Sequence, residues 1–217
     1  MNRVHLLVEG QTEETFTREL LTPHYAPQGL YITPILIQTS PGHKGGIVRY
    51  AKLKSQITRL CRQDPGSQVS TFIDLYALPG DYPGKTAPEY SKQSNGRAKA
   101  DYLEHQLQTD ISEPNFIPNI MVHEFETLLF VAPERFADWT DEETVRQLTA
   151  IRRRYPNPED INDHAETAPS KRILNLMGDY QKTFHGPLIT AETGLDALRR
   201  DCPHFHAWLT RLETLIS

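Results

Sequence analysis

Four short apolar runs, separated by segments with helical periodicity, constrain the fold of this 217-residue chain more than any other feature. They are rich in Val, Ile, Leu and Phe and cover residues 3–8, 30–38, 69–76 and 116–122. Strands that alternate with helices pair in parallel through right-handed crossovers. The sequence therefore predicts an α/β fold with a mostly parallel, four-stranded sheet flanked by helices.

The segments between these runs carry helix signals. We predict a helix from about Thr12, taken as its N-cap, with Glu13 in its first turn. Further helices are predicted over 42–62 and 96–108. In the second run, Pro34 has no backbone N–H to donate. That strand should therefore lie at a sheet edge or contain a bulge.

Near Pro133 the sequence pattern changes from alternating strands and helices to helices alone. Residues 133–217 show helical patterns punctuated by prolines, without a convincing strand. We predict an α/β domain over residues 1–132 and a helical extension over 133–217 packed on it. A single domain overall is the alternative.

Composition excludes several classes of protein. Apolar residues make up 38% of the chain, and their longest runs are far shorter than the roughly 20 residues that span a bilayer. From the first residues we expect no cleavable signal, and Cys61 and Cys202 are too few for a disulfide framework. We expect a cytoplasmic protein with reduced thiols and no membrane partner. The net charge of −5 does not favour nucleic acid through the overall field, although carboxylates that hold metal contribute to that sum.

Acidic residues stand at the ends of three of the four predicted strands. Glu9 follows the first strand, Asp74 lies in the third, and Glu124 and Glu126 follow the fourth. The carboxyl ends of parallel strands share one edge of a sheet, where ligands bind. Carboxylate oxygens are the ligands that Mg²⁺ and Mn²⁺ prefer. The sequence predicts a metal site of Glu9, Asp74 and either Glu124 or Glu126.

Asp74 is the most informative of these acids, because a carboxylate inside an apolar strand is unfavourable unless it is paired or bound to metal. Glu9 taken alone is also typical of an acid that caps a helix. Tyr76 stands two residues after Asp74, on the same strand face, where a second acid is expected. Asp81, in the next loop, either supplies that carboxylate or is a turn residue.

Two further side chains are candidates for chemistry at a phosphate. Lys171, at a predicted helix N-terminus capped by Ser170, either stabilises charge on phosphate oxygens or is an ordinary exposed base. His123 is predicted to orient a ligand or to shuttle a proton. If a helix begins at Glu124, then Glu124 and Glu126 diverge and His123 neighbours Glu126.

These residues occur in motifs whose order resembles a bacterial family, domain of unknown function 4276. The motifs are Val-Glu-Gly-Gln-Thr-Glu at 8–13, Asp-Leu-Tyr-Ala-Leu-Pro at 74–79, His-Glu-Phe-Glu at 123–126 and Ala-Pro-Ser-Lys-Arg at 168–172. The resemblance covers nearly the whole chain. The family is similar to the TOPRIM fold found in topoisomerases, primases and the overcoming-lysogenization-defect (OLD) nucleases.

The resemblance implies a Glu after the first strand and an Asp-x-Asp after a later one, which together hold magnesium. Glu9 and Asp74 match this pattern, whereas Tyr76 replaces the second Asp. A carboxylate from 124–126 is then needed to complete the metal shell. The resemblance further implies a nucleic-acid substrate, an ATPase partner and a role in phage defence.

We therefore predict a Mg²⁺- or Mn²⁺-dependent nuclease. One alternative is a regulatory subunit of an ATPase complex that binds metal or nucleotide without activity of its own. The other is a hydrolase or transferase that acts on small phosphorylated molecules.

Overall fold

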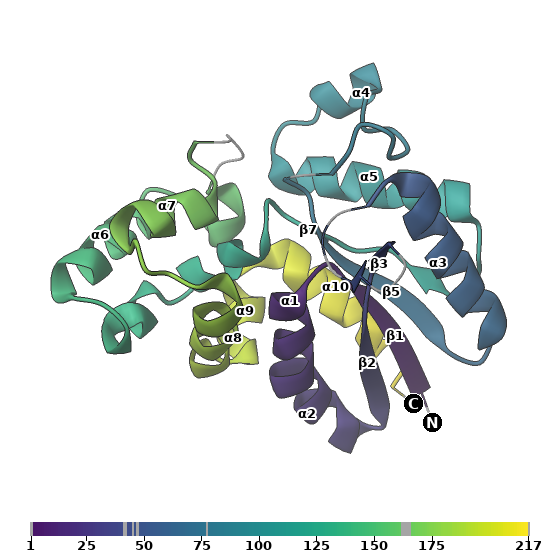
Figure 1. Cartoon of the computed structure of the whole chain (residues 1–217), viewed down its shortest axis with the longest axis horizontal. Coiled ribbons are helices and arrows are strands. Elements are labelled where there is room, and N and C mark those ends of the chain that lie inside the picture. The colour runs from purple at the N-terminus through teal and green to yellow at the C-terminus, as the bar shows by residue number, and fades with distance from the viewer. Residues whose placement is uncertain are drawn as a thin grey trace.

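A parallel sheet flanked by helices forms the centre of the protein, which confirms the predicted fold class (Figure 1). The computed structural model describes residues 2–40, 43–44, 46, 48–76, 78–161 and 166–216. The sheet has the order β2-β1-β5-β6, with β7 also paired to β5, and every pairing in it is parallel. Its strands are β1 (Asn2–Val8), β2 (Leu30–Leu36), β5 (Gln68–Asp74), β6 (Phe116–Ile117) and β7 (Ile120–Met121). A separate antiparallel pair consists of β3 (Gln38–Ser40) and β4 (His43–Lys44).

The sheet follows the sequence except in its fourth strand. β2 lies at the edge, as Pro34 predicts. The run 116–122, however, is not one strand but two short ones, broken at Pro118 and Asn119. The Thr71 hydroxyl replaces the missing ladder, because it donates to the Asn119 carbonyl at 2.8 Å and accepts from the Asn119 N–H at 3.0 Å. Pro118 has no N–H to continue the ladder, which explains the break.

Helices make up the rest of the regular structure, and beyond residue 133 they are the only regular elements in the part that the structure describes. The helices that precede η3 in the chain are α1 (Gln11–Phe16), the π-helix η1 (Thr17–Leu21), α2 (Thr22–Tyr25), η2 (Ala26–Gln28), α3 (Tyr50–Gln63), α4 (Pro88–Ser91) and α5 (Gly96–Ile111). The later ones are η3 (Phe125–Phe130), η4 (Pro133–Asp138), α6 (Glu142–Arg152), η5 (Pro158–Asp160), α7 (Pro169–Leu176), α8 (Lys182–Thr193), α9 (Leu195–Asp201) and α10 (Pro203–Glu213).

Three predicted helix starts are wrong. Gly10 rather than Thr12 is the N-cap of α1, and Thr12 is buried inside the helix. α3 begins at Tyr50. The predicted start at Gly42 itself lies outside the described residues, but His43 and Lys44 in the predicted helix form β4 instead. Ala168 rather than Ser170 is the N-cap of α7, because the Ser170 hydroxyl bonds to another segment.

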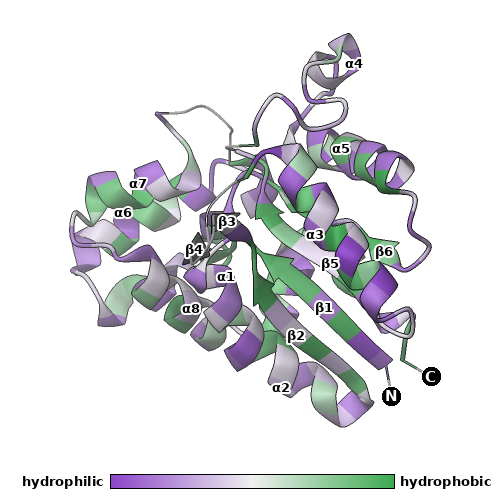
Figure 2. Cartoon of the chain, turned by 45° about the vertical axis from the view of Figure 1, so that its right-hand side comes forward, coloured by the Kyte–Doolittle hydropathy of each residue, from purple (hydrophilic) through white to green (hydrophobic). Residues whose placement is uncertain are grey.

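The two faces of the sheet have separate apolar cores, and the strands are correspondingly hydrophobic along most of their length (Figure 2). α3 and α5 pack on one face. α1, α2, α10 and the helical second half lie on the other, where Phe72 of β5 stacks on Trp208 of α10 with ring centroids 5.3 Å apart. No helix among the described residues has the length and apolar content to cross a bilayer.

Candidate metal centre

Glu9 and Asp74 meet at the carboxyl ends of neighbouring strands. The Glu9 N–H donates to the Phe72 carbonyl at 3.2 Å, which continues the pairing of β1 with β5 by one residue. The Glu9 side chain then reaches β5, where its Oε2 accepts a 3.1 Å hydrogen bond from the Asp74 N–H. Parallel pairing thus brings these two predicted residues to one edge of the sheet.

The segment after β7 adds two more acids to this edge. The Phe125 N–H donates to Asp74 Oδ1 at 3.0 Å, which ties the start of η3 to the end of β5. Glu124 precedes η3 with an extended backbone, and Glu126 lies in its first turn. All six residues of η3 are buried, so the apolar Leu128 and Leu129 anchor this turn in the core.

Glu124 and Glu126 diverge, as predicted for a helix that begins at Glu124, although η3 begins one residue later at Phe125. The two oxygens of Glu124 accept hydrogen bonds from Ser170, one from its N–H at 2.6 Å and one from its hydroxyl at 3.0 Å. Glu126 instead accepts a 3.5 Å hydrogen bond from the Tyr180 hydroxyl, and its other oxygen lies 3.1 Å from Lys182 Nζ. Of the two, Glu126 therefore faces Asp74 and Lys182.

Glu13 is a fifth acid of the cluster. From the sequence it is predicted only to lie in the first turn of a helix. It is 2% exposed, and its Oε1 lies 4.0 Å from Lys182 Nζ. Gly10 makes room for it, since a Cβ at Gly10 would lie 3.1 Å from Glu13 Oε2. A signal exists in the sequence, because Glu13 shares a helix face with the apolar Phe16 and Leu20.

Lys182, at the start of α8, is the cation of this cluster and was not predicted. Its Nζ lies within 4.0 Å of three carboxylates, at 3.1 Å from Glu126, 3.4 Å from Asp74 and 4.0 Å from Glu13. α8 reaches α1 because Gly186 has no side chain, and a Cβ there would lie 3.2 Å from Thr12 Cγ2. The two helices run side by side in Figure 1. The Lys182 side chain is 40% exposed, so it connects the buried acids to solvent.

The acids of this cluster hold their protons more strongly than free carboxyls do. Burial, followed by the charge of Asp74, raises the pKa of Glu9 to about 7 and that of Glu13 to about 8. Burial also raises the pKa of Glu126 to about 7, although Lys182 opposes it. For Lys182, burial lowers the pKa, but the surrounding carboxylates raise it by more. Among the side chains that the structure describes, one ammonium thus faces five acids, and the cluster favours additional positive charge.

The residues present fit a hard divalent cation. All the acidic donors are carboxylate oxygens, which suits Mg²⁺ or Mn²⁺. Glu126 Oε2 is fully buried and accepts no hydrogen bond from the described residues, although the Lys182 ammonium is close. Within the described part of the chain, no three of these acids bring ligand atoms within 4.8 Å of one another. The acids thus surround Lys182, and their oxygens do not converge on a single position for a metal ion.

Asp81 and Lys171 are exposed and make no described contact with the acidic cluster. Asp81 is exposed, and its Oδ2 accepts a 3.1 Å hydrogen bond from the Tyr50 N–H at the start of α3. Lys171 is exposed on α7 and forms no ion pair with a described carboxylate of the cluster. The physical reason is helical rotation, since Ser170 faces Glu124 and the next residue points roughly 100° away.

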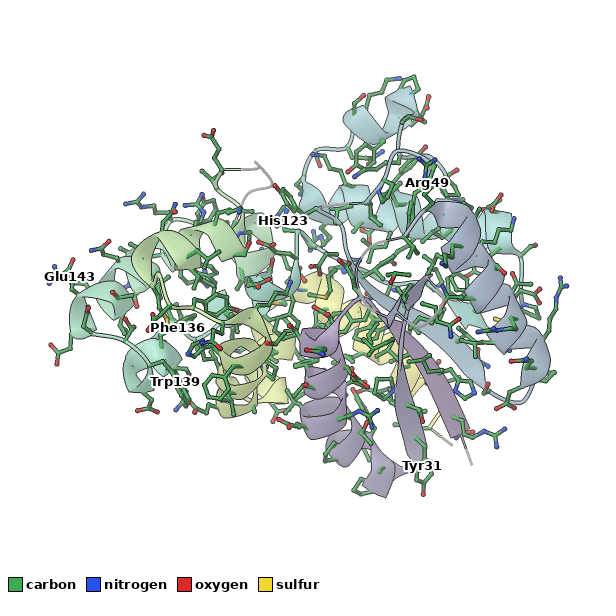
Figure 3. All side chains as sticks on the ribbon, in the orientation of Figure 1. Tyr31, Arg49, His123, Phe136, Trp139 and Glu143 are labelled. Atoms are coloured by element: carbon green, nitrogen blue, oxygen red, sulfur yellow. The ribbon has the colours of Figure 1, made fainter. Side chains whose placement is uncertain are left out.

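His123 turns toward α5 and η5, and the helical pairing with Glu126 does not form, because η3 begins only at Phe125. His123, which is labelled in Figure 3, has a positive φ of 64°. Its Nε2 lies 2.9 Å from the Glu159 carbonyl. The ring rests on Gly96, where an added Cβ would lie 2.5 Å from His123 Cε1. The imidazole thus packs between α5 and η5.

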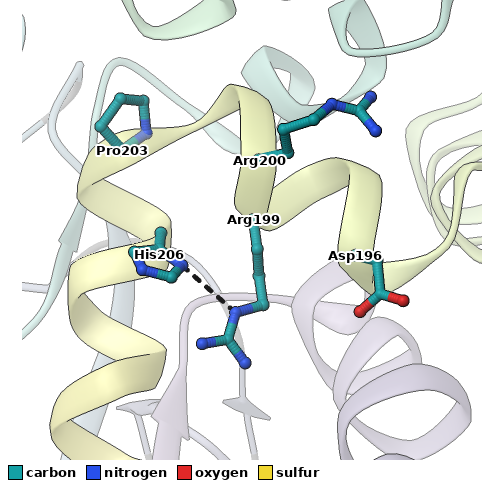
Figure 4. A pocket seen from close by; sticks show the side chains of 5 residues that line it. All are labelled: Asp196, Arg199, Arg200, Pro203 and His206. Atoms are coloured by element: carbon teal, nitrogen blue, oxygen red, sulfur yellow. Dashed lines mark hydrogen bonds between the residues drawn. The ribbon is translucent and has the colours of Figure 1, made fainter.

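A cavity of about 490 Å³ lies between α9 and α10, apart from the cluster (Figure 4). Its lining includes Arg199, whose Nε donates to His206 Nδ1 at 3.3 Å. Arg199 also pairs with Glu213. None of the predicted site residues lines this cavity, so it adds nothing to the metal centre.

Residues 8–213 match the family described as Domain of unknown function (DUF4276). The chain belongs to this family. A solved structure of the C-terminal region of the Burkholderia pseudomallei OLD protein is similar, with a TM-score of 0.51, 15% identity and 100% of each chain covered. The C-terminal region of the Xanthomonas campestris pv. campestris OLD protein gives a TM-score of 0.41 and 13% identity over 96% of each chain. Among curated proteins, none matches the sequence.

These comparisons confirm the family resemblance that the motifs predict. At 15% identity, the likeness to the Burkholderia pseudomallei structure shows a shared fold and no more. That fold extends over the whole DUF4276 chain, including its helical second half.

Proposed function

We propose that this DUF4276 chain is a divalent-metal-dependent phosphodiester hydrolase, a nuclease of TOPRIM type. The observation that carries the proposal is the meeting of five acids and one lysine at the carboxyl edge of a parallel sheet. They come from the end of β1, the start of α1, the end of β5, the η3 turn and the start of α8. The shared fold with an OLD C-terminal region supports the same proposal.

Glu9, Asp74 and Glu126 would hold Mg²⁺ or Mn²⁺, with Glu13 beside them. A bound cation supplies Lewis acidity and lowers the pKa of its water. Backbone N–H groups fix two of these carboxylates, since Asp74 orients Glu9 and Phe125 orients Asp74. Glu124 has both oxygens engaged by Ser170, so we assign it to the positioning of α7.

Lys182 would take the role that is predicted for Lys171 from the sequence. Its ammonium lies beside Asp74 and Glu126 and is reached from solvent. A cation there stabilises the negative charge that develops on the nonbridging oxygens of a phosphate in the transition state. The partly exposed four-carbon stem allows the ammonium to leave the acids and meet a substrate.

A regulatory role without catalysis is the second candidate. It is favoured by the position of Lys182, which already neutralises part of the cluster, and by Tyr76, which stands where a second acid is expected. In this case the chain would bind metal or nucleotide and serve an ATPase partner, as the family resemblance implies.

The test is cleavage of duplex DNA, single-stranded DNA and RNA by the purified chain with Mn²⁺ or Mg²⁺. We expect cleavage by the natural chain and a loss of at least about 100-fold in Asp74→Asn. Asp81→Asn is the matched control, because it makes the same change outside the cluster and keeps an oxygen that can accept from Tyr50. Equal cleavage by the natural chain and Asp74→Asn would refute the assigned site. A melting temperature that rises with Mn²⁺, without cleavage of any substrate, would favour the regulatory role.

A further inference from the structure

A second group of side chains that could bind a metal lies beside β6 and β7, at the sheet edge opposite to β2. Asp101 and Glu104 stand three residues apart on α5 and share one face of that helix. His204 is the second residue of α10, which covers the other face of the sheet. The Ile120 N–H of β7 donates to Glu104 Oε1 at 2.8 Å, which places the group at this edge.

The three side chains have the spacing of metal ligands. Each offers one atom, and these atoms all lie within 4.8 Å of one another. His204 Nε2 is 3.0 Å from Glu104 Oε1 and 3.4 Å from Asp101 Oδ1. Ligand atoms about 2.0–2.1 Å from a tetrahedral Zn²⁺ are separated by about 3.3 Å, so these distances suit such an ion.

His204 supplies an independent sign of a missing partner. It is 3% exposed, and neither of its ring nitrogens forms a hydrogen bond with the described residues. Its Nε2 lies close to both carboxylates but meets the geometry of a hydrogen bond with neither. A buried imidazole that only formed an ion pair would be expected to satisfy one of these bonds.

The surroundings hold Glu104 in place and leave a way in for an ion. The Ile120 N–H orients Oε1, and Arg211 donates to Oε2 at 3.0 Å. Hydrogen bonds of this kind fix the carboxylates of metal sites. The Asp101 side chain is 62% exposed at a cavity of about 330 Å³, which His105 also lines.

We propose that Asp101, Glu104 and His204 form a second metal site, separate from the strand-end acids, for an ion of the Zn²⁺ type. The imidazole nitrogen is what distinguishes it, since nitrogen ligands favour Zn²⁺, Co²⁺ or Ni²⁺ over Mg²⁺. The ion would join α5 to α10 around the edge of the sheet, and so link the helical layers of its two faces.

The experiment measures Zn²⁺ binding to the full chain, free of any histidine tag and stripped of metal, by calorimetry and by thermal melting. It is carried out in the Asp74→Asn background, which weakens binding at the strand-end acids. We expect Zn²⁺ to raise the melting temperature of this protein, because the ion binds the folded state. Co²⁺ in place of Zn²⁺ should show the visible absorption of a nitrogen-bound ion.

Adding Asp101→Asn should weaken Zn²⁺ binding at least tenfold and remove most of the rise in melting temperature. Asp101 is exposed, so this change leaves the fold intact. Adding Asp138→Asn instead is the control, since it neutralises an exposed acid elsewhere and should change nothing. Unchanged Zn²⁺ affinity in the Asp101→Asn protein, or no effect of Zn²⁺ on melting, would overturn the proposal. Neither outcome is read from nuclease activity, so this proposal and the proposed function can fail separately.

Discussion

Glu9 and Asp74 are joined by a 3.1 Å hydrogen bond from the Asp74 N–H to the Glu9 carboxylate, although 65 residues separate them in the chain. The donor is a backbone group, so it remains when the side chain of Asp74 is changed. The Asp74→Asn variant therefore removes one charge from the cluster and leaves the anchor of Glu9 in place. A loss of metal binding in that variant can be assigned to the Asp74 carboxylate itself.

Lys182 should separate catalysis from metal binding. Lys182→Met removes the ammonium that lies near three acids, so we expect Mn²⁺ to bind more tightly. Cleavage should nevertheless fall about 100- to 1,000-fold, because the charge on the phosphate loses its stabilising partner. Calorimetry and single-turnover cleavage check the two halves of this prediction. Lys171→Met is the matched control and should resemble the natural chain, and the reverse pattern would return the role to Lys171.

The raised pKa values of the acids predict an unusual dependence of stability on pH without metal. Folded Glu9 and Glu126 keep their protons to about pH 7 and Glu13 to about pH 8, whereas the unfolded chain loses them near 4.5. The folded state then binds more protons in this window, so the free energy of unfolding should fall as pH rises from about 5 to 8. Urea unfolding in EDTA measures this decline.

Two comparisons assign that decline to the cluster. Mn²⁺ should reduce it, since the cation replaces the protons. Glu126→Gln should make it shallower by at most about 1.4 kcal/mol per pH unit, the contribution of one proton. His204 has a raised pKa, because its carboxylate neighbours outweigh the effect of burial, and acts in the same direction. A slope that Glu126→Gln leaves unchanged would therefore assign the decline to His204 or to another group.

The sequence could place Glu9 and Asp74 because their position depends on strand order alone. Apolar runs separated by helices imply parallel pairing, and parallel pairing gathers strand ends at one edge. Helical periodicity could also have placed Glu13 in the site, because this acid shares the apolar face of a helix with Phe16. The break of the fourth strand at Pro118 could also have been predicted, because proline has no N–H to continue the hydrogen-bond ladder.

Lys182 could not be predicted in this way. Its place depends on how closely α8 approaches α1, which Gly186 permits through the absence of a side chain. Nothing near residue 182 in the sequence shows that contact. Lys171 had the better local signal, yet Ser170 is the residue that faces the acids, and one step along a helix changes the direction of a side chain by roughly 100°.

We also propose that the two halves, 1–132 and 133–217, depend on each other for folding. Trp208 in the second half is fully buried, stacks on Phe72 of β5 and donates from its Nε1 to the Ser70 hydroxyl at 3.0 Å. Trp208→Ala should lower the free energy of unfolding by about 3–5 kcal/mol, measured in urea. Trp139→Ala, at a half-buried ring that packs on the exposed Phe184, should cost less than half as much. A fragment of residues 1–132 that unfolds cooperatively would contradict this dependence.

The close approach of His123 to Gly96 gives a prediction on packing that is independent of metal. Gly96→Ala places a methyl group 2.5 Å from His123 Cε1 and 2.9 Å from its Nε2, and the buried ring has little room to move. We expect a loss of about 1–3 kcal/mol in the free energy of unfolding, even though Ala is otherwise the better helix former. Gly178→Ala is the control, since a Cβ there meets no atom within 4 Å. If Gly96→Ala were as stable as the natural chain, His123 would have to leave its contact with α5, and a role near the acids would become open to it again.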